Sequence, residues 1–467
     1  MTTPDEHHPD FARRGQAAYE AATRVFNLFA PVTPAAAVTA RSTEEVRAAI
    51  TRARARGLGV RVHATGHACA TARPMRDALL IRTEPAGDVG IDPRRRIARI
   101  PAGTRWGAVV EAAAPHGLAA PHGSSPTVGA VGYLLGGGLS MYARHTGLAA
   151  NSVRAIELVT ADGEQRRVDA DSDPELFWAL RGGGGGFGVV TAVEIALFPV
   201  TGVVTGAAFW PAAQAARLLP RWRAWTERAP REATTSVRVM NLPELPEVPA
   251  VLSAGPVLCL DGVVVAPGGD ATGRARRQAG ELLDPLRALA DPLMDTWHEA
   301  GPLAVPETHM DPPEPVPVLG DHLLLRELGD EGVAAFLHAT VDRPHSALTV
   351  AELRQLGGGL STPAPDSGAL GHLDARFAYS GAGVPGAGGT DGEILAHCAE
   401  VRRALSPWDT GRTAPTFVAS LEQPQGHLDA DAVLAADRVR ARVDPEGLFR
   451  GDIAPGCSAA SAAGSAR

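Results

Sequence analysis

The spacing of apolar residues predicts a strand–helix–strand unit early in the chain. Residues 38–41 and 60–62 are short apolar segments typical of strands. Between them, residues 43–56 carry apolar side chains three and four positions apart, the spacing of one helix face. Ser42 followed by Glu45 is a capping box, which marks the start of that helix. The pattern predicts a small α/β subdomain.

The same reasoning extends over the first two hundred residues. Further strands are expected over residues 79–81, 89–91, 97–100, 153–160, 164–168 and 189–198. Helices are expected over residues 11–29, 105–114 and 174–180.

The pattern changes near residue 200, where the expected elements become longer. Strands are expected over residues 203–210, 235–241, 257–266, 348–353, 373–379 and 416–421. Helices are expected over residues 212–226, 271–289, 331–340, 391–405 and 429–443. Helices that do not alternate regularly with strands favour an α+β lobe on a mostly antiparallel sheet.

Composition narrows the classes of function. A chain of 467 residues with 45% hydrophobic residues can form two or three compact lobes. Its net charge of −8 disfavours a nucleic acid or an anionic membrane as partner. All 44 basic residues are arginine, so a Walker-type phosphate loop and a Schiff-base lysine are both excluded.

Cysteine usage and the termini suggest a cytoplasmic protein. The cysteines are Cys69, Cys259, Cys398 and Cys457, and their wide spacing fits neither a disulfide framework nor a structural zinc site. The first residues lack the apolar core of a secretory signal, and no apolar run is long enough to span a membrane. The Ala/Ser/Gly-rich residues 458–467 are expected to be a disordered tail.

A glycine-containing loop follows the strand over residues 60–62. Successive N–H groups in such a loop form a nest that binds anions such as a pyrophosphate. An ordinary tight turn with a half-buried histidine explains the same residues. His63 and His67 also raise the alternative of a metal site, but this loop lacks the helical spacing of such pairs and a third ligand, so no metal is expected.

Two further glycine-rich stretches follow. Residues 122–138 are apolar as well as rich in glycine, which indicates backbone pressed closely against a large flat partner. Gly183, Gly185 and Gly188 match the dinucleotide-binding fingerprint formally. Their context is wrong for it, because a helix is expected before them and a strand after them. Ser125 lacks the elbow motif of a serine nucleophile.

Taken in order, these segments resemble the vanillyl-alcohol-oxidase (PCMH-type) superfamily of FAD-linked oxidoreductases, and most of all its berberine bridge enzyme-like branch. The similar motifs are T-G-H at residues 65–67, S-P-T-V-G and L-L-G-G-G within residues 125–138, V-T-A-D-G at 159–163, L-F-W-A-L-R-G-G-G-G-G-F-G-V-V-T at 176–191 and V-D-P-E-G-L-F at 443–449. These motifs extend over most of the chain, and they follow one another in the same order as in the family.

The resemblance implies an α+β fold: a PCMH-type FAD-binding lobe of two small α/β subdomains with an inserted antiparallel-sheet substrate lobe. The implied divisions are residues 1–200 for FAD, 201–410 for substrate, and 411–457 returning to the FAD domain. It also implies one covalent link from FAD to His67. The implied cofactor-binding residues are His63, Ala64, Thr65, Gly66, His67, Ala68, Ser125, Pro126, Thr127, Gly129, Ala130, Gly132, Tyr133, Gly136, Gly137, Leu139, Gly188, Val189 and Val190.

The chain departs from the family at two positions. Many relatives carry a cysteine, which forms a second flavin bond, where this chain has Ser125. Relatives often carry a Y-x-N motif near the end, and here the comparable residues 417–420 are F-V-A-S, so the usual catalytic tyrosine is missing. Tyr379 and Tyr133 are the catalytic candidates that remain.

Two further polar sets are weaker candidates for the missing base. They are the pair His309 and Asp311 and the pair His372 and Asp374.

The implied function is oxidation of a small organic molecule, such as a secondary metabolite or a sugar, by hydride transfer to covalently bound FAD. O2 is the expected acceptor, and a homodimer is compatible with the resemblance. The alternative is a non-redox flavoprotein cyclase, or a ligand-binding protein using the same pocket, and the missing tyrosine favours it.

Overall fold

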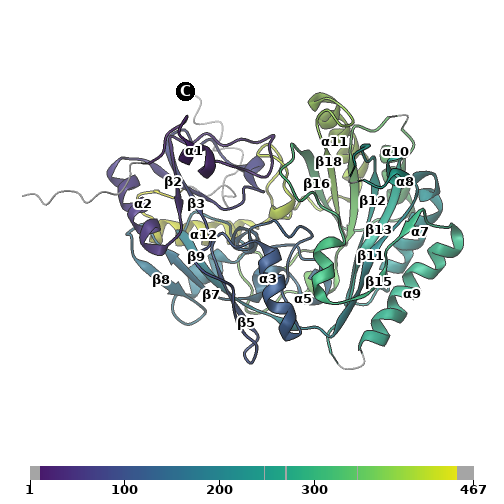
Figure 1. The fold of residues 1–467 in the computed structure, drawn as a ribbon, viewed down its shortest axis with the longest axis horizontal. Coiled ribbons are helices and arrows are strands. Elements are labelled where there is room, and N and C mark those ends of the chain that lie inside the picture. Colours follow the sequence, from purple (N-terminus) through teal and green to yellow (C-terminus); the bar gives the residue numbers. More distant parts are fainter. Residues whose placement is uncertain (1–10, 247, 269–270, 344, 450–467) are drawn as a thin grey trace, which may run out of the picture.

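The computed structural model describes residues 11–246, 248–268, 271–343 and 345–449. The expected tail therefore lies outside the described residues. The described chain folds into two bodies, one built on three small sheets and one on a single large sheet (Figure 1). No helix within these ranges is both long and apolar enough to cross a bilayer.

The first small sheet is parallel and holds the strand–helix–strand unit. Its order is β1 (Ala36–Ala40), β3 (Ala78–Thr83), β2 (Gly59–His63). Helix α2 (Thr43–Ala55) begins at Ser42, whose hydroxyl accepts the N–H of Glu45. The helix begins where the predicted capping box indicated, but only the Ser42 half of the box forms, since the Glu45 carboxylate accepts the N–H of Arg41 instead.

The other small sheets complete the first body. An antiparallel sheet has the order β4 (Gly90–Asp92), β5 (Ile97–Pro101), β9 (Val189–Ala196), β7 (Val153–Val159), β8 (Gln165–Val168), and β6 (Leu118–Ala119) pairs with β10 (Phe198–Pro199). The helices of this part are α1 (Ala17–Ala22), α3 (Trp106–Ala113), α4 (Ala130–Leu135), α5 (Ala143–Thr146) and α6 (Pro174–Leu180). Helix α12 (Ala430–Val443) packs into the core of this body, far from its neighbours in sequence (Figure 1).

The second body is built on one antiparallel sheet. Its order is β14 (Met294–Asp295), β11 (Gly202–Pro211), β13 (Val257–Ala266), β12 (Ala233–Met240), β17 (Val350–Gln355), β18 (Phe377–Gly383), β16 (Leu319–Leu325), and β15 (His298–Ala300) also pairs with β11. The helices are α7 (Ala215–Thr226), α8 (Ala250–Ser253), α9 (Ala271–Leu289), α10 (Asp330–Thr340) and α11 (Asp391–Leu405). The α+β class and the antiparallel sheet are as predicted.

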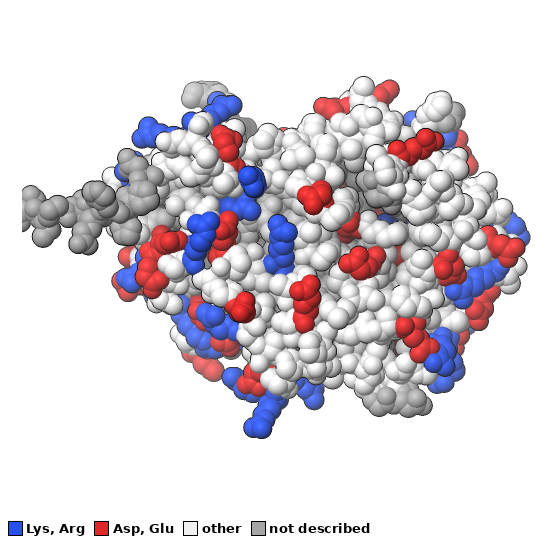
Figure 2. All heavy atoms as spheres, viewed as in Figure 1, with Lys and Arg blue, Asp and Glu red and all other residues white. Residues whose placement is uncertain are grey.

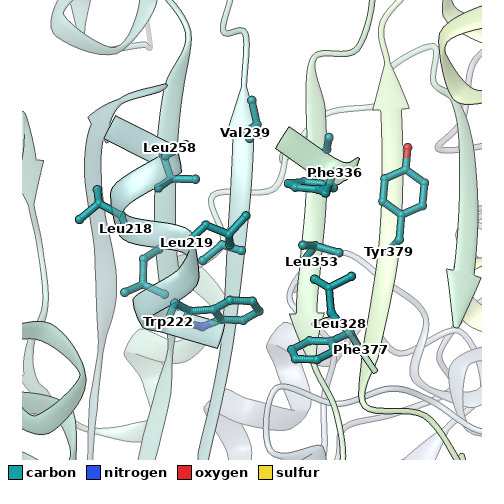
Figure 3. Close-up of a cluster of buried hydrophobic side chains, with 14 of the residues drawn as sticks. Leu218, Leu219, Trp222, Val239, Leu258, Leu328, Phe336, Leu353, Phe377 and Tyr379 are labelled. Carbon is teal, nitrogen blue, oxygen red and sulfur yellow. The ribbon is translucent and has the colours of Figure 1, made fainter. Parts of the chain in front are cut away.

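The two faces of this sheet have different partners. The outer face, which carries Val237, Leu260 and Leu353, forms one core with α7, α9, α10 and α11 (Figures 1 and 3). The inner face packs against the first body, where Val263 and Val265 share a cluster with Tyr142. Successive residues of each strand therefore point alternately to helices and to the first body.

Two sequence-based expectations were wrong, and one strand of the large sheet was missed. Residues 416–421 form no strand, because their N–H groups go elsewhere: Ala419 donates to the side chain of Gln423, and residues 415–417 make a single 3-10 turn. Strand β16 was not predicted. The helix expected over residues 11–29 shortens to α1, since Ala12 pairs with Ala37 as a β-bridge.

Charge is dispersed over the visible surface. On the face shown in Figure 2, acidic and basic side chains are interspersed, and neither sign forms a broad continuous patch.

The outer-face core predicts a contrast between two leucines. Leu219 on α7 is fully buried, whereas Leu395 on α11 is 50% exposed. Leu219→Ala should lower the free energy of unfolding by about 2–5 kcal/mol, because it leaves a cavity. Leu395→Ala should change it by less than about 0.5 kcal/mol. Urea unfolding of both variants measures the difference, and equal losses would contradict the assigned core.

Candidate functional site

The loop after β2 is shaped by a left-handed turn at Gly66. Its φ is +76°, and a Cβ at this position would lie 2.6 Å from the Cα of Val25. Only glycine fits both constraints. Within the described ranges, the N–H groups of residues 64–68 donate to no acceptor, although the loop is half-buried. A run of free amides in a glycine turn is the nest expected for an anion.

His67 lies in this loop with both ring nitrogens near hydroxyl groups. Nδ1 is 3.0 Å from Oγ1 of Thr65, and Nε2 is 3.1 Å from Oγ1 of Thr127. The ring stacks on Phe26 with a centroid distance of 3.9 Å. Burial, assisted by Arg105, lowers the pKa of His67 to about 4. The imidazole is therefore neutral at pH 7 and keeps a nucleophilic lone pair.

The second predicted loop meets the first. Ser125 Oγ is 2.8 Å from Thr127 Oγ1, and the N–H of Gly129 donates to Thr65 Oγ1 at 3.2 Å. Ala130 begins α4 directly after Gly129, and a Cβ at Gly132 would meet no atom within 4 Å. The structure thus brings together the 63–68 and 125–132 segments that the sequence singled out.

The glycines after α4 have neighbours within the protein. A Cβ at Gly136 would meet Thr416, one at Gly137 would lie 2.9 Å from Leu370, and Leu139 is buried in a neighbouring core cluster. Protein packing alone explains why glycine is needed here.

The predicted segment Gly188 to Val190 lies at the start of β9. A Cβ at Gly188 would lie 2.7 Å from the carbonyl oxygen of Val159. Val189 shares a cluster with Val60, while Val190 belongs to the core around α3 and α12. The structure also has α6 before the glycine run at 182–188 and β9 after it, which is the wrong order for the dinucleotide-binding fingerprint.

Tyr379 is misplaced for the catalytic role given to it. Its side chain lies on the outer face of β18, fully buried in the core beside its cross-strand neighbour Leu353 (Figure 3). Burial raises the pKa of its phenol well above the usual value. The alternation of a strand explains the error, since Ser380 and not Tyr379 points to the inner face.

Tyr133 remains near the second loop. Its ring packs edge-on against Trp106, and a Cβ at Gly123 would lie 3.3 Å from its hydroxyl oxygen. The hydroxyl is buried and has no hydrogen-bond partner in the described chain. Burial raises the pKa of the phenol, so it stays protonated.

The inner face of the large sheet carries a buried ionic cluster, of which the sequence analysis named only His309. We call it the inner-face cluster, and it consists of Arg238, Asp261, His309, Glu352 and Arg354. Arg238 lies 2.5 Å from Asp261, and Arg354 donates to Glu352 at 2.7 Å. Each of these side chains is less than a tenth exposed.

His309 links these ion pairs. Its Nδ1 is 3.0 Å from Oδ2 of Asp261, and its Nε2 is 3.3 Å from a guanidinium nitrogen of Arg354. Burial alone would raise the pKa of Asp261, but Arg238 and His309 beside it hold that pKa below its usual value. The pKa of Glu352 is held low against the same effect by Arg354 and His309. Both carboxyls are therefore ionised at neutral pH.

The cluster lies beside the second predicted loop. Ser124 donates to Asp311 at 2.6 Å, two residues from His309. The guanidinium of Arg354 lies over the ring of Phe417, 5.1 Å from its centroid. By contrast, His372 and Asp374 are exposed and take no part.

A sequence signal for this cluster existed. In β12, β13 and β17, single charged residues stand between apolar neighbours, as Arg238 does between Val237 and Val239. A charged side chain in a buried strand is costly unless it is paired. Each of these residues is therefore expected to lie near an oppositely charged residue of a neighbouring strand. No three His, Cys, Asp or Glu side chains of the described residues form a metal-binding group.

The Gly66 turn predicts a contrast between two glycines of similar backbone conformation. A Cβ at Gly57, with φ of +66°, would meet nothing within 4 Å, unlike one at Gly66. Both alanine variants carry the left-handed penalty, so Gly66→Ala should cost about 1–3 kcal/mol more because of the clash. Thermal and urea unfolding measure this difference. Equal losses of unfolding free energy in the two variants would show that Val25 moves away from a Cβ at residue 66 at little cost.

Part of the first body matches a known family of protein domains. Residues 34–169 match the family model described as FAD binding domain. An FAD-dependent monooxygenase of Emericella nidulans is 42% identical over 115 residues, 25% of this chain and 24% of the relative. An FAD-linked oxidoreductase of Bacillus subtilis is 31% identical over 216 residues, 45% of this chain and 48% of that protein. The matched regions thus span less than half of these relatives.

Solved structures match nearly the whole chain. The BBE-like 1 protein of Physcomitrella patens has a TM-score of 0.78 at 18% identity, covering 96% of this chain and 97% of that one. The 6-hydroxy-D-nicotine oxidase of Arthrobacter nicotinovorans has a TM-score of 0.79 at 21% identity, covering 96% and 98%. A chitooligosaccharide oxidase has a TM-score of 0.76 at 19% identity, covering 96% and 97%. Residues 34–169 therefore match an FAD-binding domain, and the chain has the fold of the BBE-like 1 protein and of 6-hydroxy-D-nicotine oxidase.

Proposed function

We propose that this protein is an FAD-dependent oxidoreductase that oxidises a small organic molecule, with O2 as the final acceptor. The observation that carries the proposal is the loop of free amides at residues 64–68, with the neutral His67 beside it. These residues lie inside the segment that matches the FAD-binding family.

The residues present fit the cofactor. Successive free N–H groups suit a pyrophosphate, which needs donors and no particular side chain. The segment from Ser125 to Gly132 lies directly against this loop, and it would hold the flavin end. Bound FAD supplies the hydride acceptor, while the protein supplies orientation and a place for the proton.

One covalent link is proposed, through His67. A neutral imidazole is a competent nucleophile towards the flavin 8α-methyl group. Ser125 stands beside Thr127 and cannot form the thioether that a cysteine there would form. The link is therefore single.

The substrate would lie between the two bodies. We assign residues 1–200 and 411–457 to FAD binding and 201–410 to the substrate, with the inner-face cluster as the polar wall of the site. Polar groups converging on an otherwise apolar surface are typical of small-molecule sites. Candidate substrates are amines and carbohydrates, in line with the names of a nicotine oxidase and a chitooligosaccharide oxidase of the same fold.

The covalent link is tested by denaturing the protein in acid and measuring flavin absorbance in the pellet. Wild-type protein should keep its flavin in the pellet, whereas His67→Ala should release all of it to the supernatant. His63→Gln is the matched control. His63 is the other histidine of the loop, but its Nε2 donates to the carbonyl of Ala22, so the variant should keep acid-stable flavin. Acid-stable flavin in His67→Ala would assign the bond to another residue.

The redox role is tested by anaerobic bleaching of the flavin. A panel of D-glucose, chitobiose, benzyl alcohol and (R)-6-hydroxynicotine is mixed with the FAD-loaded protein under nitrogen. At least one compound should remove the absorbance near 450 nm, and air should restore it. A compound that turns over while the flavin stays oxidised would defeat the redox proposal in favour of a non-redox cyclase.

A further inference from the structure

The chain between α1 and β1 makes contacts with both bodies. We call residues 22–29 the bridging segment. On the side of the first body, the carbonyl of Ala22 accepts a hydrogen bond from Nε2 of His63 at 2.7 Å. Val25 is the residue against which the turn at Gly66 packs. This side of the bridging segment is therefore fixed to the loop that would hold the cofactor.

The second body holds the other side of the bridging segment. The N–H of Val316 donates to the carbonyl of Phe26 at 3.1 Å, and the N–H of Leu28 donates to the carbonyl of Val316 at 3.0 Å. The side chain of Asn27 donates to the carbonyl of Val318 at 2.9 Å and accepts its N–H at 3.0 Å. The two valines lead into β16 of the large sheet. These hydrogen bonds fix the backbone around Phe26 relative to the second body.

Held in this way, the side chain of Phe26 meets the ring of His67. The two rings are stacked, with a centroid distance of 3.9 Å and an angle of 15° between their planes. The hydroxyls of Thr65 and Thr127 contact the two nitrogens at the edge of the imidazole, at 3.0 and 3.1 Å. A stacked aromatic pair favours one relative orientation of its rings. The phenyl group therefore restricts rotation of the imidazole.

This orientation matters for the bond that we assign to His67. The torsion that turns a histidine ring has broad preferences, so the side chain alone does not fix the plane of the ring. The lone pair of a neutral imidazole lies in that plane, and the nitrogen can form a bond only to a carbon in its direction. A neighbour that fixes the plane beforehand lowers the entropic cost of reaching the reacting geometry.

We propose that Phe26 is a positioning residue for the covalent attachment of FAD, and that the second body takes part by holding it. This role rests on the proposed function. In the step that Phe26 assists, a bond forms between one nitrogen of His67 and the flavin 8α-carbon. One proton leaves the methyl group and one leaves the imidazole. The two electrons pass through the flavin to O2, which takes up both protons and becomes H2O2.

The test follows the covalent incorporation of FAD over time. The full chain is produced with limiting riboflavin, incubated with excess FAD and precipitated in acid at intervals, and flavin absorbance is measured in the pellet. Phe26→Leu should incorporate FAD about 5–10-fold more slowly than wild type, because the stack is lost. Phe26→Tyr keeps an aromatic face and should have the wild-type rate. Phe29→Leu, the same change at a residue that is 41% exposed, is the matched control and should have no effect.

A second measurement separates positioning from direct contact with the cofactor. In His67→Ala, FAD can bind only without the proposed bond, and quenching of flavin fluorescence gives its dissociation constant. If Phe26 acts through His67, adding Phe26→Leu to this variant should change the constant by less than about threefold. A larger change would make Phe26 a residue that contacts FAD directly, and it would overturn the proposal.

Asn27 tests the contribution of the second body. Asn27→Ala removes both side-chain hydrogen bonds to Val318 and leaves the two stacked rings intact. It should slow the incorporation of FAD by about 2–5-fold, because the backbone of Phe26 is held less firmly. An unaltered rate would show that the first body alone holds Phe26, and it would overturn the role given to the second body.

The outcomes separate this inference from the proposed function. A wild-type rate in Phe26→Leu, or equal slowing in Phe29→Leu, would overturn the role of Phe26 and leave the link to His67 in place. Slow incorporation in Phe26→Tyr would overturn it as well, even where Phe26→Leu does not fold. Absence of acid-stable flavin from the wild type would overturn this role together with the covalent link. The redox role is decided separately, by bleaching of the bound flavin.

Discussion

The close contact between Gly66 and Val25 is the constraint on which the candidate site depends. It fixes a left-handed turn directly after β2, and that turn leaves the amides of residues 64–68 without acceptors in the described chain. Backbone amides that are half-buried and unpaired cost free energy unless something else satisfies them. A bound anion would remove this cost, so the local fold and the binding of a pyrophosphate support each other. His67 is positioned by the same turn.

The second organising feature is the alternation of the large sheet. One set of positions forms an apolar core with the helices, and the other presents charges to the first body. A shift of one residue moves a side chain from one environment to the other. Tyr379 and Ser380 illustrate this, since only the serine faces the inner side. Tyr379 therefore contributes to the core, and the side chains that face the first body come from the alternate positions of these strands.

The sequence predicted structural features that are local in the chain, while their role in holding a cofactor stays a prediction. The N-cap at Ser42, the turn at Gly66 and the loop at Ser125 depend on near neighbours, and the structure has a cap, a left-handed turn and a tight hydroxyl contact at these places. The inner-face cluster was missed because its members are brought together only by strand register. His309 was named as a weak candidate, but nothing local showed that Asp261 and Glu352 would flank it. The strand expected at residues 416–421 failed for a local reason, because Phe417 donates its N–H to the carbonyl of Ala414 and Ala419 donates to the side chain of Gln423.

The energetic cost of the inner-face cluster favours a function for it. Removing a charge from water costs several kcal/mol per ion, and a buried ion pair is often no more stabilising than apolar residues of the same size. This cluster buries two arginines and two carboxylates on a sheet whose other face is well packed with leucine and valine. Apolar side chains would hold the two bodies together as well. What they would not provide is a set of charges facing the first body beside the loop of Ser124, whose hydroxyl donates to Asp311.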